Sequence, residues 1–249
     1  MSGRFFIDKS VSQIDGNTAV LGGDEAHHFL RVMRGKTGDS LELFDGTGIL
    51  YRGNVTQCSK KEVSVQITQT LTDTVESPVR LTVASALPKG DRQHFLVEKL
   101  AELGAARFIP LHLERSVARA NESVISRFKR CVIETAKQCE RNILMEITGE
   151  MTLLQLDDFL RNEAENNTER YLLHPLKLGS VGQVTARSVL NCEINRPAIL
   201  IGPEGSFTEK EIESALRFGF KPLDLGARIL RTETAAIAAA AVFLTSDKH

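Results

Sequence analysis

The fold of this chain is decided by two stretches, Ala198-Ile-Leu-Ile-Gly-Pro-Glu-Gly-Ser-Phe207 and Leu225-Gly-Ala-Arg-Ile-Leu-Arg-Thr-Glu-Thr-Ala235. Each follows or contains a short apolar run typical of a buried strand, and each leads into a predicted helix. Thr208 is expected to start the first helix, because Glu211 follows it at the spacing of a capping box. Two strand–loop–helix units of this kind indicate an α/β fold with a mostly parallel sheet covered on both faces.

The two loops also predict a binding site. In Gly202-Pro203-Glu204-Gly205, two glycines let the backbone approach a ligand closely, the proline stiffens the turn, and one carboxylate remains at the end of the strand. Ligands of open α/β sheets bind at that edge. Either loop alone is better interpreted as an ordinary tight turn. The pair, with polar groups in both, favours a shared pocket.

The remaining pattern predicts two domains. Apolar runs at 41–44, 49–55 and 63–67 indicate short strands, with one helix at 25–34, and a small β-barrel would bury them without exposed edges. The polar segment 72–78 ends in proline and is expected to be a linker, which divides the chain into domains 1–72 and 73–249. The second domain is expected to have strands at 80–86, 107–113, 171–173, 198–201 and 222–225, and helices at 92–103, 123–140, 153–161, 208–218 and 232–245.

Composition indicates a cytoplasmic protein. The chain has 249 residues with ordinary apolar and charged content, and no secretory signal is visible at its start. The longest small-and-apolar run, 235–244, is too short to cross a membrane. The cysteines are widely scattered, which argues against a disulfide framework or a zinc site, and no metal is expected. They are Cys58, Cys131, Cys139 and Cys192.

Charge is distributed unevenly despite a formal net charge of −1. Residues 80–141 carry twelve Lys or Arg against seven Asp or Glu, whereas residues 142–172 carry two against seven. One face turned toward phosphates would explain this asymmetry. A solvated helix surface explains it equally well, so charge alone does not predict RNA binding.

Other motifs are weaker. Gly35-Lys36-Thr37 lacks the glycine that a P-loop needs, since Leu30 stands there, and no Gly-x-Gly-x-x-Gly follows a predicted strand. His27 and His28 are adjacent and so do not share a helix face, which argues against a metal site. His174 follows a predicted strand and precedes Pro175, so it is either part of a pocket wall or a surface-loop histidine.

The two loop motifs resemble those of the SPOUT methyltransferases, most closely the RsmE type. Supporting matches are Glu98-Lys-Leu-Ala-Glu-Leu-Gly104, Glu114-Arg-Ser-Val117, Glu134-x-Ala136-x-Gln138-Cys139-x-Arg141, and His27-His28-x-x-x-Val32-x-Arg34 followed by Gly38-Asp39. The resemblance spans nearly the whole chain. Lys137 and Glu140 depart from the pattern, where an acidic and a small residue are expected.

The resemblance implies a fold, a cofactor and a partner. The fold would be an N-terminal PUA-like β-barrel that binds RNA and a C-terminal SPOUT α/β domain with a deep trefoil knot, a rare exception to unknotted chains. The enzyme would be a homodimer that uses S-adenosylmethionine to methylate N3 of a uridine in 16S ribosomal RNA of the small subunit. The alanine-rich run of 235–241 agrees with close packing against a knot loop or a second subunit. The implied cofactor-binding residues are Leu173, His174, Ile201, Gly202, Pro203, Glu204, Gly205, Leu225, Gly226, Ile229, Leu230 and Thr234.

Uridine N3 methylation requires loss of an imide proton and in-line placement of the methyl group. Glu204 and Glu233 are candidates for handling the proton, although both could equally brace loops. Arg231 has the planar, permanently charged donor array that would stabilise negative charge on the uracil carbonyls. The residues expected to contact RNA phosphates are Arg4, Arg92, Lys99, Arg115 and Arg141. Two alternatives remain open: a non-catalytic RNA-binding or ribosome-assembly factor, and a SPOUT enzyme acting on transfer RNA.

Overall fold

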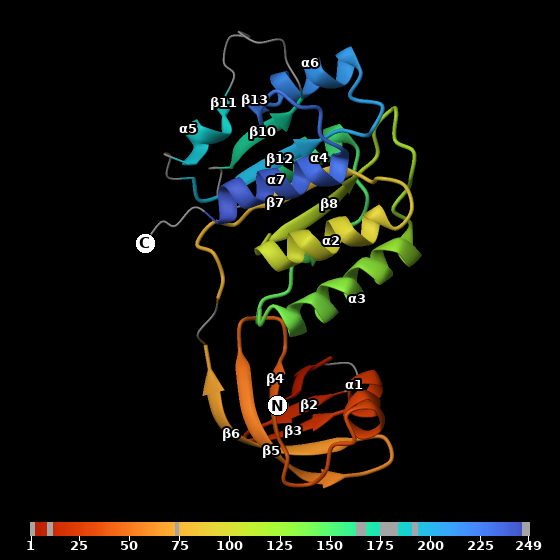
Figure 1. Ribbon diagram of the computed structural model, residues 1–249, viewed down its shortest axis with the longest axis vertical. Helices are drawn as coiled ribbons and strands as arrows, with labels where there is room; N and C mark the ends of the chain where they lie inside the picture. The colour runs from red at the N-terminus through yellow and green to blue at the C-terminus, as the bar shows by residue number, and fades with distance from the viewer. Residues whose placement is uncertain are drawn as a thin grey trace. The chain divides into compact units, whose positions relative to one another are not determined.

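The computed structural model describes residues 3–8, 12–72, 75–162, 168–174, 184–190 and 194–245 (Figure 1). The chain forms two compact units. Unit 1 comprises residues 1–76 together with 133–144, and unit 2 comprises residues 77–132 and 145–249. Helix α3 (Glu122–Gln138) therefore contributes its last turns to unit 1, although the sequence division at residues 72 and 73 places that helix in the second domain.

Unit 1 is built on a six-stranded sheet in the order β1-β4-β5-β6-β3-β2. Among the described strands of this sheet, only β1 and β4 pair in parallel, and every other pair is antiparallel. Alternate residues of β5 and β6 are buried, as expected for a half-buried sheet. The strands are β1 (Gly3–Phe6), β2 (Gln13–Asp15), β3 (Thr18–Leu21), β4 (Ser40–Phe44), β5 (Leu50–Cys58) and β6 (Val63–Leu71).

The helix predicted at 25–34 is shorter and irregular. It begins as α1 (Gly23–His27) and continues as the π-helical turn η1 (His28–Val32). Phe29 of that turn packs edge-on against Phe5, with ring centroids 5.7 Å apart, inside the buried core of the sheet. The Phe29 ring occupies the space beside Gly35, where a Cβ at residue 35 would overlap the ring.

The segment 133–144 is fastened to unit 1 by packing and by charge. Ala136 packs with Phe44 and Leu50 in a small buried cluster. Lys137 pairs with Glu25 at 2.7 Å, so this residue, which departs from the pattern of the resembling family, has an ionic partner within unit 1. Arg141 is nearly fully buried and makes a two-pronged ion pair with Glu76, its Nη2 lying 2.7 Å from Oε2.

Unit 2 contains a seven-stranded sheet in the order β11-β13-β10-β12-β7-β8-β9, and every described pair is parallel. This confirms the predicted mostly parallel sheet. Its strands are β7 (Thr82–Ala86), β8 (Arg107–Leu111), β9 (Glu146–Ile147), β10 (Glu169–Leu173), β11 (Val184–Thr185), β12 (Pro197–Ile201) and β13 (Lys221–Asp224). Its helices, besides the first part of α3, are α2 (Arg92–Leu103), α4 (Leu153–Asn162), α5 (Ala186–Leu190), α6 (Glu209–Arg217) and α7 (Thr232–Leu244).

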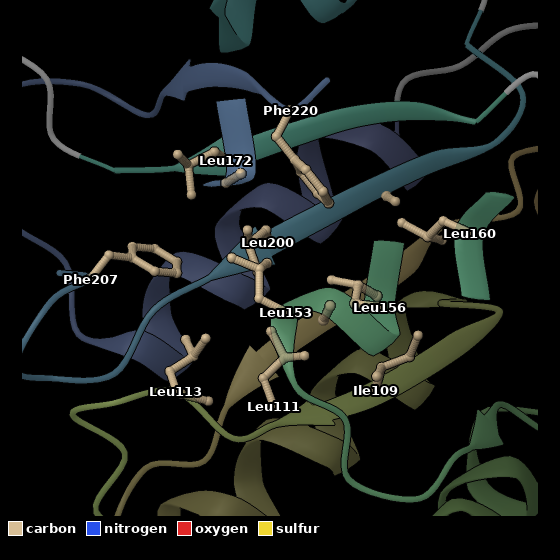
Figure 2. Close-up of a cluster of buried hydrophobic side chains, with 14 residues drawn as sticks. Ile109, Leu111, Leu113, Leu153, Leu156, Leu160, Leu172, Leu200, Phe207 and Phe220 are labelled. Atoms are coloured by element: carbon tan, nitrogen blue, oxygen red, sulfur yellow. The ribbon is translucent and has the colours of Figure 1, made fainter. Parts of the chain in front are cut away.

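Helices cover both faces of this sheet. Alternate strand residues such as Leu111 and Leu200 pack with Leu156 of α4 and with Phe220 in one buried cluster (Figure 2). The opposite face carries α7, since Tyr171 of β10 contacts Phe243 at a ring-centroid distance of 5.3 Å. Helix α2 lies beside α7 in front of the sheet (Figure 1). The central strands are therefore buried on both sides, which explains their continuous apolar runs.

Local sequence signals place the helix boundaries well. Helix α2 spans the predicted residues 92–103 and ends at Gly104, whose φ of 97° is left-handed. Helix α6 begins with the predicted capping box of Thr208 and Glu211. Short elements were missed, among them β1, β2, β3, β9, β11 and α5, because runs of two to five residues carry little periodicity.

Within the described ranges, no helix is long and apolar enough to cross a membrane. Cys58, Cys131 and Cys139 form no disulfide with one another, and Cys192 lies outside the described residues.

Candidate functional site

A cavity of about 860 Å³ lies in unit 2 where three neighbouring parallel strands end. Leu173 ends β10, Ile201 ends β12 and Asp224 ends β13, so the two loops quoted first meet at one sheet edge as the pattern predicts. The lining residues are Arg92, Leu173, His174, Ile201, Gly202, Pro203, Glu204, Gly205, Ser206, Phe207, Leu223, Asp224, Leu225, Gly226, Arg228, Ile229, Leu230, Arg231, Thr232 and Ala235.

The first loop is held by its own turn and by the core beneath it. The Ser206 amide donates to the Pro203 carbonyl at 2.8 Å, and Ser206 adopts a left-handed φ of 61°. The Phe207 side chain then points into the buried cluster of unit 2 (Figure 2). A Cβ at Gly202 would lie 2.7 Å from the Phe207 ring, so glycine is needed there for packing as well as for access to the cavity.

A neighbouring loop braces the first one from outside. The Arg115 guanidinium donates from Nη1 to the Gly205 carbonyl at 2.9 Å. The Glu114 amide donates to the Glu211 carboxylate, which also completes the cap of α6. A Cβ at Gly205 would press on the Arg115 side chain at 3.3 Å, so a larger residue there would disturb this brace.

The second loop is more open. Gly226 has a left-handed φ of 106°, and its amide donates to the Asp224 carboxylate at 2.8 Å. The Ile229 side chain is 90 % exposed at the rim of the cavity. The loop ends at Thr232, whose hydroxyl donates to the Gly202 carbonyl at 3.2 Å and so ties the start of α7 to the first loop.

A guanidinium and two carboxylates meet at one wall of the cavity. Arg92, the first residue of α2, places Nη1 2.5 Å from Glu204 Oε1 and 3.4 Å from Glu233 Oε1. The hydrogen bond that Arg92 donates to Glu204 raises the pKa of Arg92, so the guanidinium remains charged. Glu233 is 7 % exposed, and its second oxygen has no hydrogen-bond partner in the described part of the chain. Arg92 therefore connects α2 with the loop after β12 and with the first turn of α7.

His174 lies at the end of β10 with its ring edge-on to Phe207, at a centroid distance of 6.2 Å. Its Nδ1 is buried and makes no hydrogen bond to the described residues. Burial lowers the pKa of His174, which favours a neutral imidazole near pH 7. Of the two readings of this histidine, its position matches the pocket wall.

The helical turn decides which residues of the second motif reach the cavity. Arg231, Thr232 and Ala235 line it, whereas Glu233 and Thr234 do not. Successive helix residues are rotated by about 100°, so positions one turn apart share a face and those between them turn away. Glu233 approaches the site only through Arg92, and Thr234 has no place among the lining residues.

The cavity also includes residues that the motif analysis did not single out. Asp224 and Arg228 belong to the second loop or its strand, and Ser206 and Phe207 to the first. Arg228, Ser206 and Phe207 lie within the quoted stretches and Asp224 directly precedes the second one, which was the available signal. The guanidinium of Arg231 makes no ion pair or hydrogen bond to the described residues, which leaves its donors available at the cavity.

The five residues expected to contact RNA do not form one group. Arg4 donates to the Arg141 carbonyl and to Asn142 and lies over Phe44, and Arg141 is paired with Glu76, so both are engaged within unit 1. Lys99 pairs with Glu98 and Glu102 on α2. The other two lie at the cavity, Arg92 as part of its wall and Arg115 as the brace of its first loop.

No cluster of three or more His, Cys, Asp or Glu side chains suited to a metal ion occurs in the described ranges. The polar groups at the cavity are instead guanidinium groups, carboxylates and loop backbone.

Comparison with known proteins identifies relatives over the whole chain. A family model described as an RNA methyltransferase domain matches residues 75–244, and one described as an RNA methyltransferase PUA domain matches residues 21–68. A ribosomal RNA small subunit methyltransferase E of Synechocystis is 33 % identical over 92 % of this chain and 73 % of its own length.

Two solved structures share the architecture. A methyltransferase from Legionella pneumophila, solved with bound S-adenosylmethionine, has a TM-score of 0.82 and 31 % identity, with 98 % of each chain covered. A ribosomal RNA small subunit methyltransferase E from Neisseria gonorrhoeae, also bound to S-adenosylmethionine, has a TM-score of 0.81 and 28 % identity, again with 98 % of each chain covered.

Proposed function

This chain belongs to the RNA methyltransferase family of the ribosomal RNA small subunit methyltransferase E type, and we propose that it transfers a methyl group from S-adenosylmethionine to N3 of a uridine in 16S ribosomal RNA. The observation that carries the proposal is the cavity formed by two glycine-bearing loops at the ends of neighbouring parallel strands. The protein therefore catalyses a methyl transfer to an RNA base, and it acts in the cytoplasm.

The cavity fits such a cofactor. Its volume lies within the range of small-molecule sites, roughly 300–1,000 Å³. Leu173, Ile201 and Leu225 supply apolar walls for a base, and the glycine-containing loops supply backbone amides and carbonyls. Apart from the residues next to Gly226 in the chain, no atom of the described residues lies within 4 Å of the position a Cβ would take there, so ligand atoms can approach this backbone. When bound, S-adenosylmethionine supplies an electrophilic methyl group.

The carboxylates have unequal access to a substrate. Glu204 lines the cavity with a side chain 36 % exposed, whereas Glu233 is buried behind Arg92. We assign Glu204 to receive the N3 proton, either directly or through water, and Glu233 to hold Arg92 in place. The guanidinium of Arg92 keeps the Glu204 carboxylate oriented through its 2.5 Å contact.

Arg231 is assigned to the developing negative charge. As the N3 proton leaves, charge accumulates on the uracil carbonyl oxygens, and a fixed guanidinium at the cavity stabilises it. Arg231 lines the cavity without an internal partner in the described part of the chain, so it meets the requirement of an available donor.

RNA phosphates are assigned to cations of unit 2 that solvent can reach. Arg115 is exposed, and the Lys99 side chain is 31 % exposed although it is paired with Glu98 and Glu102. Arg4 and Arg141 are assigned a structural role within unit 1, because their side chains already bind partners there. A charge that is already paired and desolvated contributes little counterion release on RNA binding.

We also infer a homodimer whose C-terminal domain contains the trefoil knot implied by the family. Ile229 supports the dimer, because it is the most exposed large apolar side chain of the described residues, at 90 %, and lies at the rim of the cavity, where a second subunit would cover it. The hydrogen bond of Thr232 to Gly202 supports close interleaving of the two C-terminal loops.

The test is methylation of small-subunit ribosomal RNA by the purified chain with labelled S-adenosylmethionine, followed by mass spectrometry of nucleosides. The expected product is 3-methyluridine. Cofactor binding without methylation, or no cofactor binding at all, would support a non-catalytic RNA-binding factor. Methylation of transfer RNA alone would support the other alternative, a SPOUT enzyme that acts on transfer RNA. Light scattering of the same sample tests the dimer.

A further inference from the structure

A second cavity lies at the opposite edge of the parallel sheet of unit 2, where the strands begin. It measures about 40 Å³ and is lined by Arg80, Thr82, Ala106, Arg107, Thr168 and Arg196. Three of these six residues are arginines. None of them belongs to the motifs of the two C-terminal loops, and the methyl-transfer site does not use them.

The sheet topology brings these residues together. Strands β10, β12, β7 and β8 are consecutive neighbours, and each contributes residues at or just before its start. Backbone hydrogen bonds fix the edge: the Arg80 amide donates to the Asn195 carbonyl at 2.8 Å, and the Glu169 amide donates to the Arg196 carbonyl at 3.2 Å. Thr82 of β7 lies opposite Arg107 of β8 in the parallel register.

Three of the described residues that line this cavity carry a guanidinium group. Arg107 is paired with Glu146 at 2.7 Å and stacks over Phe159 at 4.8 Å, so one guanidinium is compensated. Arg80 has no acidic partner in the described ranges, and Arg196 adds a third cation. Next to Thr168, the Glu169 carboxylate accepts a hydrogen bond from the Tyr171 hydroxyl at 2.6 Å. None of the described residues that line the cavity carries a carboxylate.

The remaining lining suits an oxyanion. Thr82 is 6 % exposed, and its hydroxyl makes no hydrogen bond to the other described residues. Guanidinium groups and hydroxyls are the donors that bind phosphate oxygens in proteins. A volume of about 40 Å³ corresponds to roughly three water-sized positions, which is the scale of one tetrahedral oxyanion.

We propose that the cavity at the strand starts of unit 2 binds a phosphate group, held by Arg80, Arg107 and Arg196 with the hydroxyls of Thr82 and Thr168. The group is either a phosphodiester of bound RNA or a free phosphate anion. Strands β7 and β8 each span five residues, so this site lies about 15 Å from the strand ends that form the methyl-transfer cavity. Changes here leave that cavity intact.

The test compares the full-length wild-type chain with Arg80→Gln and Arg196→Gln. Arg217→Gln is the matched control, because Arg217 is exposed on α6 of the same unit and lines neither cavity. Inorganic phosphate is titrated by calorimetry at constant ionic strength. Binding of small-subunit ribosomal RNA is measured over a series of salt concentrations. S-adenosylmethionine affinity and the thermal midpoint are measured for every variant.

Saturable phosphate binding by the wild type and Arg217→Gln that is lost in the Arg80 and Arg196 variants supports the site. If the same two variants also lower the slope of log affinity against log salt by roughly 0.7–0.9, the ligand is an RNA phosphate. An unchanged slope with lost phosphate binding identifies a free anion, and a lowered slope without free phosphate binding again identifies RNA.

The proposal is overturned if phosphate at millimolar concentration does not bind and the RNA salt slopes of all variants equal that of the wild type. This failure is separate from failure of the methyltransferase assignment. The latter is reported by the wild-type affinity for S-adenosylmethionine, which does not depend on the second cavity.

Discussion

Arg92 and Glu204 form a direct ion pair, with Nη1 2.5 Å from Oε1, that joins the start of α2 to the loop after β12. The same guanidinium reaches Glu233 in the first turn of α7 at 3.4 Å. A residue expected from the sequence to meet RNA phosphates is therefore a component of the cavity wall. Its charge is already shared between two carboxylates.

Replacing Arg92 by Gln should lower the single-turnover methylation rate by tenfold to a hundredfold, on the order of the cost of misplacing a reacting group. The salt dependence of RNA binding should stay near the wild-type value, because the lost charge was internally compensated. Lys99→Gln on the same helix is the comparison, because loss of a phosphate contact should lower the salt slope and leave the rate at saturating RNA near the wild-type value. If Arg92→Gln instead lowered the salt dependence of RNA affinity and left the rate at saturating RNA unchanged, Arg92 would be a phosphate contact.

Replacing Arg231 by Ala should reduce the methylation rate about a hundredfold, equivalent to about 3 kcal/mol of transition-state stabilisation, with a much smaller loss of RNA affinity. Lysine should not restore the rate, because a point charge does not reproduce the planar donor array. Single-turnover kinetics beside RNA binding separate the two effects. Loss of affinity alone would remove Arg231 from the catalytic residues.

Gly202→Ala should destabilise the protein by about 1–3 kcal/mol, because the new methyl would lie 2.7 Å from the buried Phe207 ring. Gly149→Ala is the matched control: no atom lies within 4 Å of its Cβ position, and its stability should change by less than about 0.5 kcal/mol. Urea unfolding measures both. Equal stability of the two variants would show that Phe207 moves aside without cost.

Acid should destabilise the folded state through His174. Because burial lowers the pKa of His174 in the folded state, the unfolded chain binds more protons once the pH falls below its ordinary value of 6.5. This contribution to stability is therefore present above that pH and is lost as the pH falls. His174→Gln should show a weaker loss between pH 7.5 and 5.5 in urea unfolding than the wild type. An equal loss of stability in His174→Gln and in the wild type over this pH range would contradict the prediction.

Arg141→Gln should destabilise the chain by about 3 kcal/mol, because it leaves the largely buried Glu76 without its two-pronged partner. The salt dependence of RNA binding should not change. Arg130→Gln, at an exposed position on α3, should alter stability by less than about 0.5 kcal/mol. A stable Arg141 variant with a reduced salt slope would restore the expectation that Arg141 contacts phosphate.

Local signals in the sequence were enough for the larger elements of unit 2. The capping box at Thr208 and the left-handed Gly104 mark helix boundaries that depend on neighbouring residues only. The apolar runs before the two loops predicted buried parallel strands, and the rule that ligands bind where such strands end placed the cavity. The shortest strands of unit 1 were missed, because their pairing comes from distant partners rather than from their own periodicity.

By itself, the sequence determined the strand–loop–helix units, the family and the edge of the sheet at which the two glycine-bearing loops meet. Only the tertiary structure decided which charged residues are paired and where. The inclusion of 133–144 in unit 1, the sharing of Arg92 between Glu204 and Glu233, and the gathering of Arg80, Arg107 and Arg196 at the strand starts all join residues far apart in the chain. The physical reason is that local propensity acts over a few residues, whereas the partner of a charge is set by strand order and packing.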